Sequence, residues 1–235
     1  MRNNRGFSLL EITIVLLIVG LLLAGVLGPL STQIEQKKRQ RAKEQLEDIR
    51  EALFGFAITK GRLPCPDTDG SGSENYTGTP PNHSCINTIP NELPWKDLHV
   101  LEFDPWREHF IYRVVGTFAD GSLNTNTFAP PAATCLTTPS LGVTFALCTE
   151  ASIKVLSAKG VTPAVMDNIP AIVVSKGGHN LAADDSDDEK ENYDNNNNFV
   201  SRTFSMTSDN EFDDLMIWIS PNILKYRMVQ AGRLP

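Results

Sequence analysis

The sequence predicts an α+β fold in which a long N-terminal helix packs on a small antiparallel β-sheet. Three observations lead to this prediction. An apolar run occupies residues 7–30, a helix-favouring segment rich in Gln, Lys, Glu, Arg, Ala and Leu follows over 31–60, and short β-prone runs fill much of the rest. Strands that follow a helix in this way are typical of α+β domains. The 235 residues leave room for one globular domain beyond the helix.

The apolar run is long enough to cross a membrane as a helix. It has three polar side chains, Ser8, Glu11 and Thr13, in 24 residues. Such a helix measures about 36 Å, against about 30 Å for the hydrocarbon core of a bilayer. A carboxylate in this segment costs roughly 2.5–3.5 kcal/mol on insertion scales, so we interpret Glu11 as functional. The alternative is an ordinary signal anchor in which Glu11 reaches a lipid headgroup.

The first eleven residues combine a basic leader with a small residue, an aromatic residue and a carboxylate. Gly6 follows the two leader arginines, Phe7 comes next, and Glu11 lies four residues further on. This pattern is similar to the processing signal of type IV pilins and type II secretion pseudopilins. The resemblance implies that a prepilin peptidase cleaves between Gly6 and Phe7 and that the new Phe7 amine is N-methylated. It also implies that Glu11 neutralises the terminal amine of a neighbouring subunit in a filament.

The resemblance and the residue patterns together divide the chain into four expected parts. Residues 1–6 are the leader, 7–30 the transmembrane and filament-core helix, 31–60 an amphipathic helix, and 61–235 a periplasmic head of the type IV pilin fold with an acidic loop at 184–198. The amphipathic helix has an apolar stripe at 3-4-3 spacing, which we expect to carry the head. The stripe consists of Leu46, Ile49, Leu53 and Phe56.

The basic residues after the apolar run favour the opposite membrane orientation. Five positive charges follow the run and two precede it, namely Lys37, Lys38, Arg39, Arg41 and Lys43 against Arg2 and Arg5. By the positive-inside rule alone the head would be cytoplasmic. Because the leader and the cysteines agree with each other, we expect a single-pass inner-membrane protein with its head in the periplasm, which enters a periplasmic or extracellular filament on assembly. The basic residues then contact lipid headgroups or acidic faces of neighbouring subunits.

Four cysteines lie beyond the apolar run, which is compatible with disulfides in an oxidising compartment. Three pairings are possible, and we favour Cys65–Cys85 and Cys135–Cys148 because each pair closes a loop rich in Pro, Thr and Asn. Reduced structural cysteines are the alternative. A zinc site is disfavoured because the sequence has no C-x-x-C spacing and its four histidines are scattered.

The head has five runs with strand propensity, at residues 110–118, 143–148, 153–157, 169–175 and 199–206. Turn residues separate them. We expect these runs to form the antiparallel sheet that packs on the stripe of the long helix.

Two later passages resemble the major pseudopilins of type II secretion. Residues 104–112 are similar in part to the strand-entry motif of that family, with Arg107 and His109 where the family has Gly and Pro. Residues 175–178, an acidic loop, and then Asp213-Asp214-Leu-Met-Ile-Trp218 resemble the family's calcium loop. The resemblance implies calcium as a cofactor held by Asp213 and Asp214, and carboxylates are ligands that calcium prefers. The alternatives are an N-cap role for these two residues and a solvated charge run over 184–198.

Composition and motifs disfavour an enzyme and a nucleic-acid-binding protein. The formal net charge is −7, so no nucleic-acid partner is expected. The sequence lacks G-x-S-x-G, P-loop and H-E-x-x-H motifs. The resemblance implies a structural subunit of a type II secretion pseudopilus or type IV pilus-like filament, with other pilin subunits, the prepilin peptidase, an inner-membrane assembly platform and lipid as partners. The alternatives are a minor pilin of an adhesive or DNA-uptake pilus and a membrane-anchored periplasmic binding protein that never polymerises.

Overall fold

The computed structural model describes residues 8–79, 82–86, 91–121, 142–178, 186–207 and 211–234, without the side chains of 23–31 and 82. The chain divides into two compact units. The first, Met1–Arg41, contains the N-terminal part of helix α1 (Leu9–Lys60). The second, Ala42–Pro235, contains the rest of α1 and every other helix and strand described.

Helix α1 covers both helical segments that the sequence predicts. Its C-terminal part buries the whole predicted stripe, with exposed fractions of at most 9% for Leu46, Ile49, Leu53 and Phe56. The helix ends before Gly61, which has a φ of +76° and so takes the left-handed conformation that glycine favours at this position. A Cβ at Gly61 would lie 1.9 Å from the carbonyl oxygen of Gly142, so this end of the helix needs glycine for a second reason.

A four-stranded antiparallel sheet forms the centre of the head, in the order β3-β4-β7-β9. Its strands are β3 (Asn91–Glu92), β4 (Ile111–Val114), β7 (Ala171–Ser175) and β9 (Leu215–Trp218). The register pairs Ile111 with Val174 between β4 and β7, and Ile172 with Trp218 between β7 and β9. All five residues of β7 are buried, because this strand has neighbours at both edges and packing partners on both faces.

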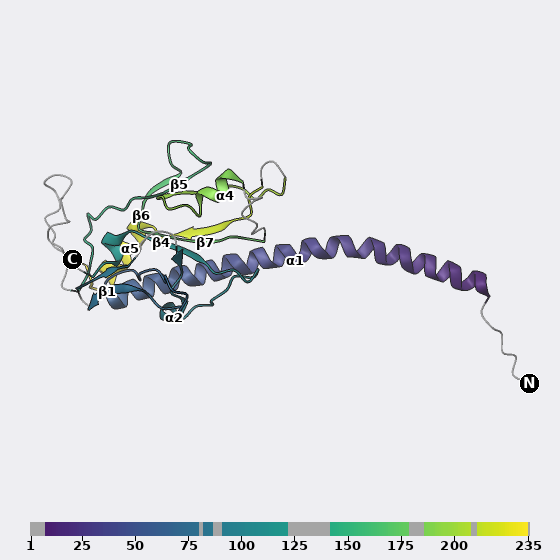
Figure 1. Cartoon of the computed structure of the whole chain (residues 1–235), viewed down its shortest axis with the longest axis horizontal. Coiled ribbons are helices and arrows are strands. Elements are labelled where there is room, and N and C mark those ends of the chain that lie inside the picture. Colours follow the sequence, from purple (N-terminus) through teal and green to yellow (C-terminus); the bar gives the residue numbers. More distant parts are fainter. Residues whose placement is uncertain are drawn as a thin grey trace, which may run out of the picture. The chain divides into compact units, whose positions relative to one another are not determined.

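The two faces of this sheet contact different layers. On one face, Tyr112 and Val173 pack with the stripe of α1 and with helix α5 (Pro221–Gln230). On the other face, Ile172 and Val174 pack with a second sheet in the order β6-β5-β8. Alternate residues of a strand point to opposite faces, so β7 contributes to both cores. Figure 1 shows β7 between the C-terminal part of α1 and strand β5.

The second sheet differs from the expected antiparallel arrangement. It consists of β6 (Met166–Ile169), β5 (Ile153–Leu156) and β8 (Asn198–Val200), and β5 pairs antiparallel with β6 but parallel with β8. The parallel pair is possible because a long connection through β6, β7 and helix α4 (Asp187–Glu191) returns the chain to the same end of the sheet. The fold is α+β with an N-terminal helix, antiparallel sheets and this one parallel pair.

The predicted strand runs agree only in part with the observed elements. The run 110–118 forms β4 and then turns into the short helix α3 (Gly116–Ala119), and the run 169–175 holds the last residue of β6 and, after Pro170, the whole of β7. The run 199–206 is a strand only as far as Val200. The run 143–148 is not a strand, because Thr149 closes a local turn by donating its backbone N–H to the oxygen of Ala146. Val143, Phe145 and Ala146 are buried by packing instead of by strand pairing, whereas Leu147 is exposed.

A disulfide and a buried ion pair hold the segment after α1. Cys65 and Cys85 form a disulfide with a Cα–Cα distance of 5.3 Å, which joins this segment to the hairpin of β1 (Tyr76–Thr79) and β2 (Asn82–Cys85). Within the same region the Arg62 guanidinium donates two hydrogen bonds to Glu74, at 2.6 and 2.7 Å. Cys148 is also disulfide-bonded, and its expected partner Cys135 lies outside the described residues.

The entry to β4 contains a strained residue at the position where the related motif has glycine. After helix α2 (Trp95–Leu98), the Asp104 carboxylate accepts hydrogen bonds from the N–H groups of Trp106 and Glu108, both at 2.9 Å. Arg107 has a φ of +75°, a conformation that costs a residue with a Cβ about 1–2 kcal/mol. The turn therefore keeps the shape for which glycine is suited, although the residue is arginine.

Across the part of the chain that the structure describes, no helix is both long and apolar enough to cross a membrane. The membrane-spanning segment at residues 7–30 stays a prediction from the sequence.

Candidate functional site

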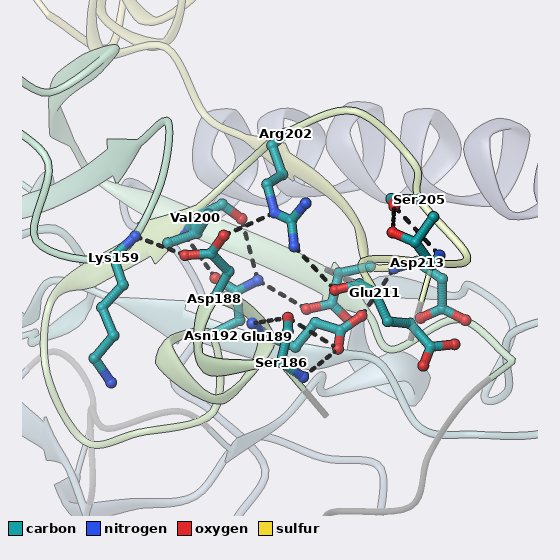
Figure 2. Close-up of polar contacts among 12 residues, drawn as sticks. Lys159, Ser186, Asp188, Glu189, Asn192, Val200, Arg202, Ser205, Glu211 and Asp213 are labelled. Atoms are coloured by element: carbon teal, nitrogen blue, oxygen red, sulfur yellow. Dashed lines mark hydrogen bonds and ion pairs between the residues drawn. The ribbon is translucent and has the colours of Figure 1, made fainter. Parts of the chain in front are cut away.

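Three buried carboxylates converge at one end of the central sheet. Glu189 comes from α4, and Asp213 and Asp214 directly precede β9. One oxygen of each lies within 4.8 Å of the others, and the three residues are at most 5% exposed. Figure 2 shows Glu189 and Asp213 with the polar groups that surround them. The structure thus brings the two aspartates predicted from the sequence together with a third acid that the sequence reasoning did not select.

Glu189 is fixed by a capping box at the start of α4. Its Oε2 accepts a hydrogen bond of 2.9 Å from the Ser186 N–H, and the Ser186 hydroxyl accepts one of 3.3 Å from the Glu189 N–H. The other carboxylate oxygen, Oε1, accepts a hydrogen bond of 2.8 Å from the Asp213 N–H. Ser186-x-x-Glu189 is a recognisable helix-start pattern, so it is the sequence signal that could have identified Glu189.

Asp213 connects the cluster to the end of β7. Its Oδ2 accepts a hydrogen bond of 2.7 Å from the Gly178 N–H. The neighbouring Gly177 has a φ of +72°, and a Cβ there would lie 2.4 Å from the Asp213 carboxylate. Glycine is therefore needed at position 177 so that the backbone can approach this acid closely.

Asp214 is held by the turn that follows α4. The Asn192 amide donates to its Oδ2 at 2.7 Å, and the Tyr193 hydroxyl donates to its Oδ1. The pKa of Asp214 is raised to about 8, chiefly by burial and in smaller part by the charges of Glu189 and Asp213, while the hydrogen bonds from Asn192 and Tyr193 act in the opposite direction. Without a bound cation, this carboxyl therefore carries a proton at neutral pH.

Residues 186–198 form a packed structure and do not make the open acidic loop expected from composition. Besides Glu189, the side chains of Glu191 and Asn192 are buried. Ion pairs offset part of the acidic charge, with Arg202 Nε 2.8 Å from Asp188 and Lys159 Nζ 3.1 Å from Glu191. The acidic segment thus becomes one wall of the carboxylate cluster. Asp184 and Asp185, also part of the predicted loop, lie outside the described residues.

The N-cap alternative for Asp213 and Asp214 is wrong. The apolar run that follows them is strand β9, and the next helix, α5, begins at Pro221 after Ser220. Neither aspartate can cap a helix from that distance, because an N-cap side chain bonds the second or third N–H of the helix itself.

The three carboxylates fit a calcium ion chemically. Two ligands on opposite sides of Ca²⁺ are separated by up to about 5 Å, since each Ca–O bond is about 2.3–2.6 Å. The spread of 4.8 Å among the oxygens lies within that limit. Each carboxylate oxygen can accept a hydrogen bond and still offer a lone pair, so the bonds from Ser186, Asn192 and Gly178 are compatible with ligation. The repulsion among the three carboxylate charges is relieved either by a bound cation or by a proton on Asp214.

The other residues predicted for a functional role lie at the start of the chain. Glu11 is in the first turn of α1, where its side chain is exposed. Its backbone N–H donates to the Ser8 oxygen at 3.0 Å. Gly6 and Phe7, the predicted cleavage position, lie outside the described residues.

Comparison with known proteins gives one match, at this end of the chain. Residues 1–27 match the family model described as the prokaryotic N-terminal methylation motif. The start of the chain therefore carries the N-terminal motif of type IV pilin-like proteins. The match ends inside α1 and leaves the head, including the carboxylate cluster, without a counterpart. No curated protein and no solved structure matches the chain.

The protonated state of Asp214 gives a pH prediction. The folded chain keeps this proton up to a pH of about 8, whereas the unfolded chain releases it above about 4, so the stability from the neutral carboxyl is lost as the pH rises between these values. In detergent solution with chelator, wild type should lose unfolding free energy relative to Asp214→Asn as the pH is raised from about 5 to about 8. Thermal unfolding followed by tryptophan fluorescence measures the difference, and parallel pH profiles of the two proteins would contradict it.

Proposed function

We propose that this chain is a structural subunit of a type II secretion pseudopilus or a type IV pilus-like filament. The observation that carries the proposal is the N-terminal methylation motif at residues 1–27, which continues directly into helix α1. On this proposal the prepilin peptidase cleaves after Gly6, Phe7 becomes the methylated N-terminus, and the chain has no catalytic role. Its proposed role is mechanical. The filament assembles and disassembles, and a motor made of other chains drives both processes.

The chemistry of the N-terminal segment supports assembly through α1. Cleavage places a positive amine at Phe7, four residues before Glu11. In an apolar environment each isolated charge carries a desolvation cost of several kcal/mol, and pairing recovers much of that cost. We infer that Glu11 of one subunit pairs with the amine of the next, so that only registers that form this pair are favourable.

The head supports the same proposal in three respects. A single helix supplies both the N-terminal segment and the buried stripe of the head, as a filament built around helices requires. The antiparallel sheet packed on that stripe is compatible with a pilin fold. The Cys65–Cys85 disulfide suits a head exposed to an oxidising compartment such as the periplasm, with residues 7–30 anchored in the inner membrane before assembly.

We further propose that Glu189, Asp213 and Asp214 bind calcium, which favours the pseudopilin form of the proposal. A bound ion would supply positive charge where three acids meet at the joint between α4, β7 and β9. It would therefore stabilise the attachment of the acidic segment to the sheet.

The first prediction of the proposal concerns processing. Membrane material from cells that make the full-length chain together with a prepilin peptidase should yield a chain that starts at a methylated Phe7. N-terminal sequencing and intact mass measure this directly. A chain that retains Met1 in these cells would contradict the pilin proposal.

The second prediction concerns Glu11. Glu11→Gln removes the charge while keeping the size and polarity, so it should leave membrane insertion intact and lower the yield of sheared filaments by at least about tenfold. Glu11→Asp keeps the charge and should retain much more of the yield. Equal yields from wild type and Glu11→Gln would contradict the charge-pairing role.

The third prediction concerns calcium. At a pH near 8, calcium should raise the unfolding midpoint of the detergent-solubilised protein by several degrees, and the increase should be absent in Asp213→Asn. Asp187→Asn is the matched control, because Asp187 is an exposed acid on the same helix as Glu189. Equal responses of the two variants, or no response of wild type, would remove the calcium proposal.

A further inference from the structure

Strand β9 leaves one edge of the central sheet open. It is the last strand in the order β3-β4-β7-β9. Within the described part of the chain, no backbone group of another element bonds to its outer side. Its sequence, Leu-Met-Ile-Trp, has neither charge nor proline, the features with which natural proteins commonly protect exposed edges.

The strand register identifies the backbone groups at this edge. The Ile219 N–H donates to the Ala171 oxygen at 2.9 Å, so these residues form a hydrogen-bonded pair. Pairs alternate along an antiparallel ladder, so Ile217 also bonds to β7, whereas the N–H and C=O groups of Met216 and Trp218 point away from it. An extended chain beside β9 would find two donors and two acceptors there.

A groove runs along this edge between β9 and helices α1 and α5. Its volume is about 390 Å³, and the side chains that line it include Phe54 of α1, Trp218 of β9 and Ile223 of α5. Ile223 is 48% exposed, so its side chain is accessible at this edge. A strand edge beside a helix with apolar positions is an arrangement that receives an extended peptide.

The charges in the groove are already balanced. Arg227 donates to Glu51 through both terminal nitrogens, at 2.6 and 3.0 Å, and its guanidinium lies 4.3 Å from the centre of the Phe54 ring. Arg50 pairs with Glu47 one turn away on α1. The groove therefore favours an uncharged, apolar segment, because a charged one would be desolvated without a counterion.

The head itself presents such a segment on a different element. The hairpin between β5 and β6 has no charged residue from Gly160 to Met166. Three of its apolar side chains are exposed, with fractions of 41–60% for Val161, Val165 and Met166. Strand β6 is also the outer strand of its own sheet, so the hairpin can offer backbone groups as well.

We propose that the β9 groove of one copy binds the β5–β6 hairpin of a second copy of this chain. The contact joins two different surfaces. In a pair of copies, the first therefore keeps its hairpin free and the second keeps its groove free, and each can bind a further copy. Such heterologous contacts generate an open helical assembly when the rotation between copies does not close into a ring. The inference extends the proposed function, because it gives the heads a contact of their own in addition to the one proposed for the N-terminal helices.

Thiol cross-linking tests this contact in membranes that contain the full-length chain. The cysteines in the described residues, Cys65, Cys85 and Cys148, are disulfide-bonded, so a bismaleimide should not react with them, and the chain without introduced cysteines serves as the background control. The double variant Ile223→Cys with Val165→Cys should give a ladder of cross-linked dimers, trimers and larger species. Each single variant should give no ladder, and neither should Val229→Cys with Val165→Cys. Val229 is a suitable control because it is 39% exposed on the same helix but does not line the groove.

Charge introduction gives a second readout. In the double-cysteine variant, Val161→Glu places an unpaired charge in the contact and should lower the yield of the cross-linked ladder by at least about tenfold, whereas Val229→Glu should not. If the double-cysteine variant does not cross-link, or gives only dimers, the inference is overturned.

Electron microscopy of the same material separates the head contact from the proposed filament function. Filaments without a ladder keep the filament function and remove the head contact, while a ladder without filaments keeps the head contact and removes the filament function.

Discussion

The burial of β7 on both faces is the constraint on which the rest of the head depends. Ala171 and Val173 pack toward α1, and Ile172 and Val174 pack toward the second sheet. A shift of one residue in register would exchange these faces, so the pairing of β7 with β4 and β9 is strongly specified. The same strand then determines where its C-terminal end lies, and this end carries the glycines that approach the acidic cluster.

The carboxylate cluster follows from that placement. The strand pair β7–β9 brings Gly178 to Asp213, and α4 brings Glu189 to the same point through its capping box. Three buried carboxylates repel one another unless one of them is protonated or a cation binds. The cluster therefore has two favourable states, one protonated and one with a bound cation. The proton on Asp214 stabilises the head at low pH, and a divalent cation would do so at higher pH, where the carboxylates are ionised. We therefore expect the attachment of the acidic segment to the sheet to respond to pH and, on the calcium proposal, to divalent cations.

The sequence predicts local features well where one periodicity dominates. The stripe at Leu46, Ile49, Leu53 and Phe56 follows from helical spacing, and its burial is confirmed. Runs of apolar residues are less informative, because the side chains at 143–148 serve packing instead of a strand, and those at 199–206 leave the sheet after Val200. The parallel pairing of β5 with β8 depends on contacts between distant segments, and no local pattern encodes it. The sequence does not single out Glu189 as a site residue, because a charge run suggests solvation, although the capping box at Ser186 marks an ordered helix start.

On the proposed function, the chain is a head attached to a long helix, and the N-terminal segment of that helix drives assembly. The methylation motif supports that role, and the helix that follows it supplies both the N-terminal segment and the packing surface of the head. The most direct test is a cryo-electron microscopy reconstruction of filaments sheared from cells that make the full-length chain. The account predicts a helical array with the N-terminal parts of α1 at its centre and the Glu11 carboxylate within ion-pair distance of a neighbour's Phe7 amine. Filaments with the heads at the centre, or with Glu11 directed to solvent, would contradict it.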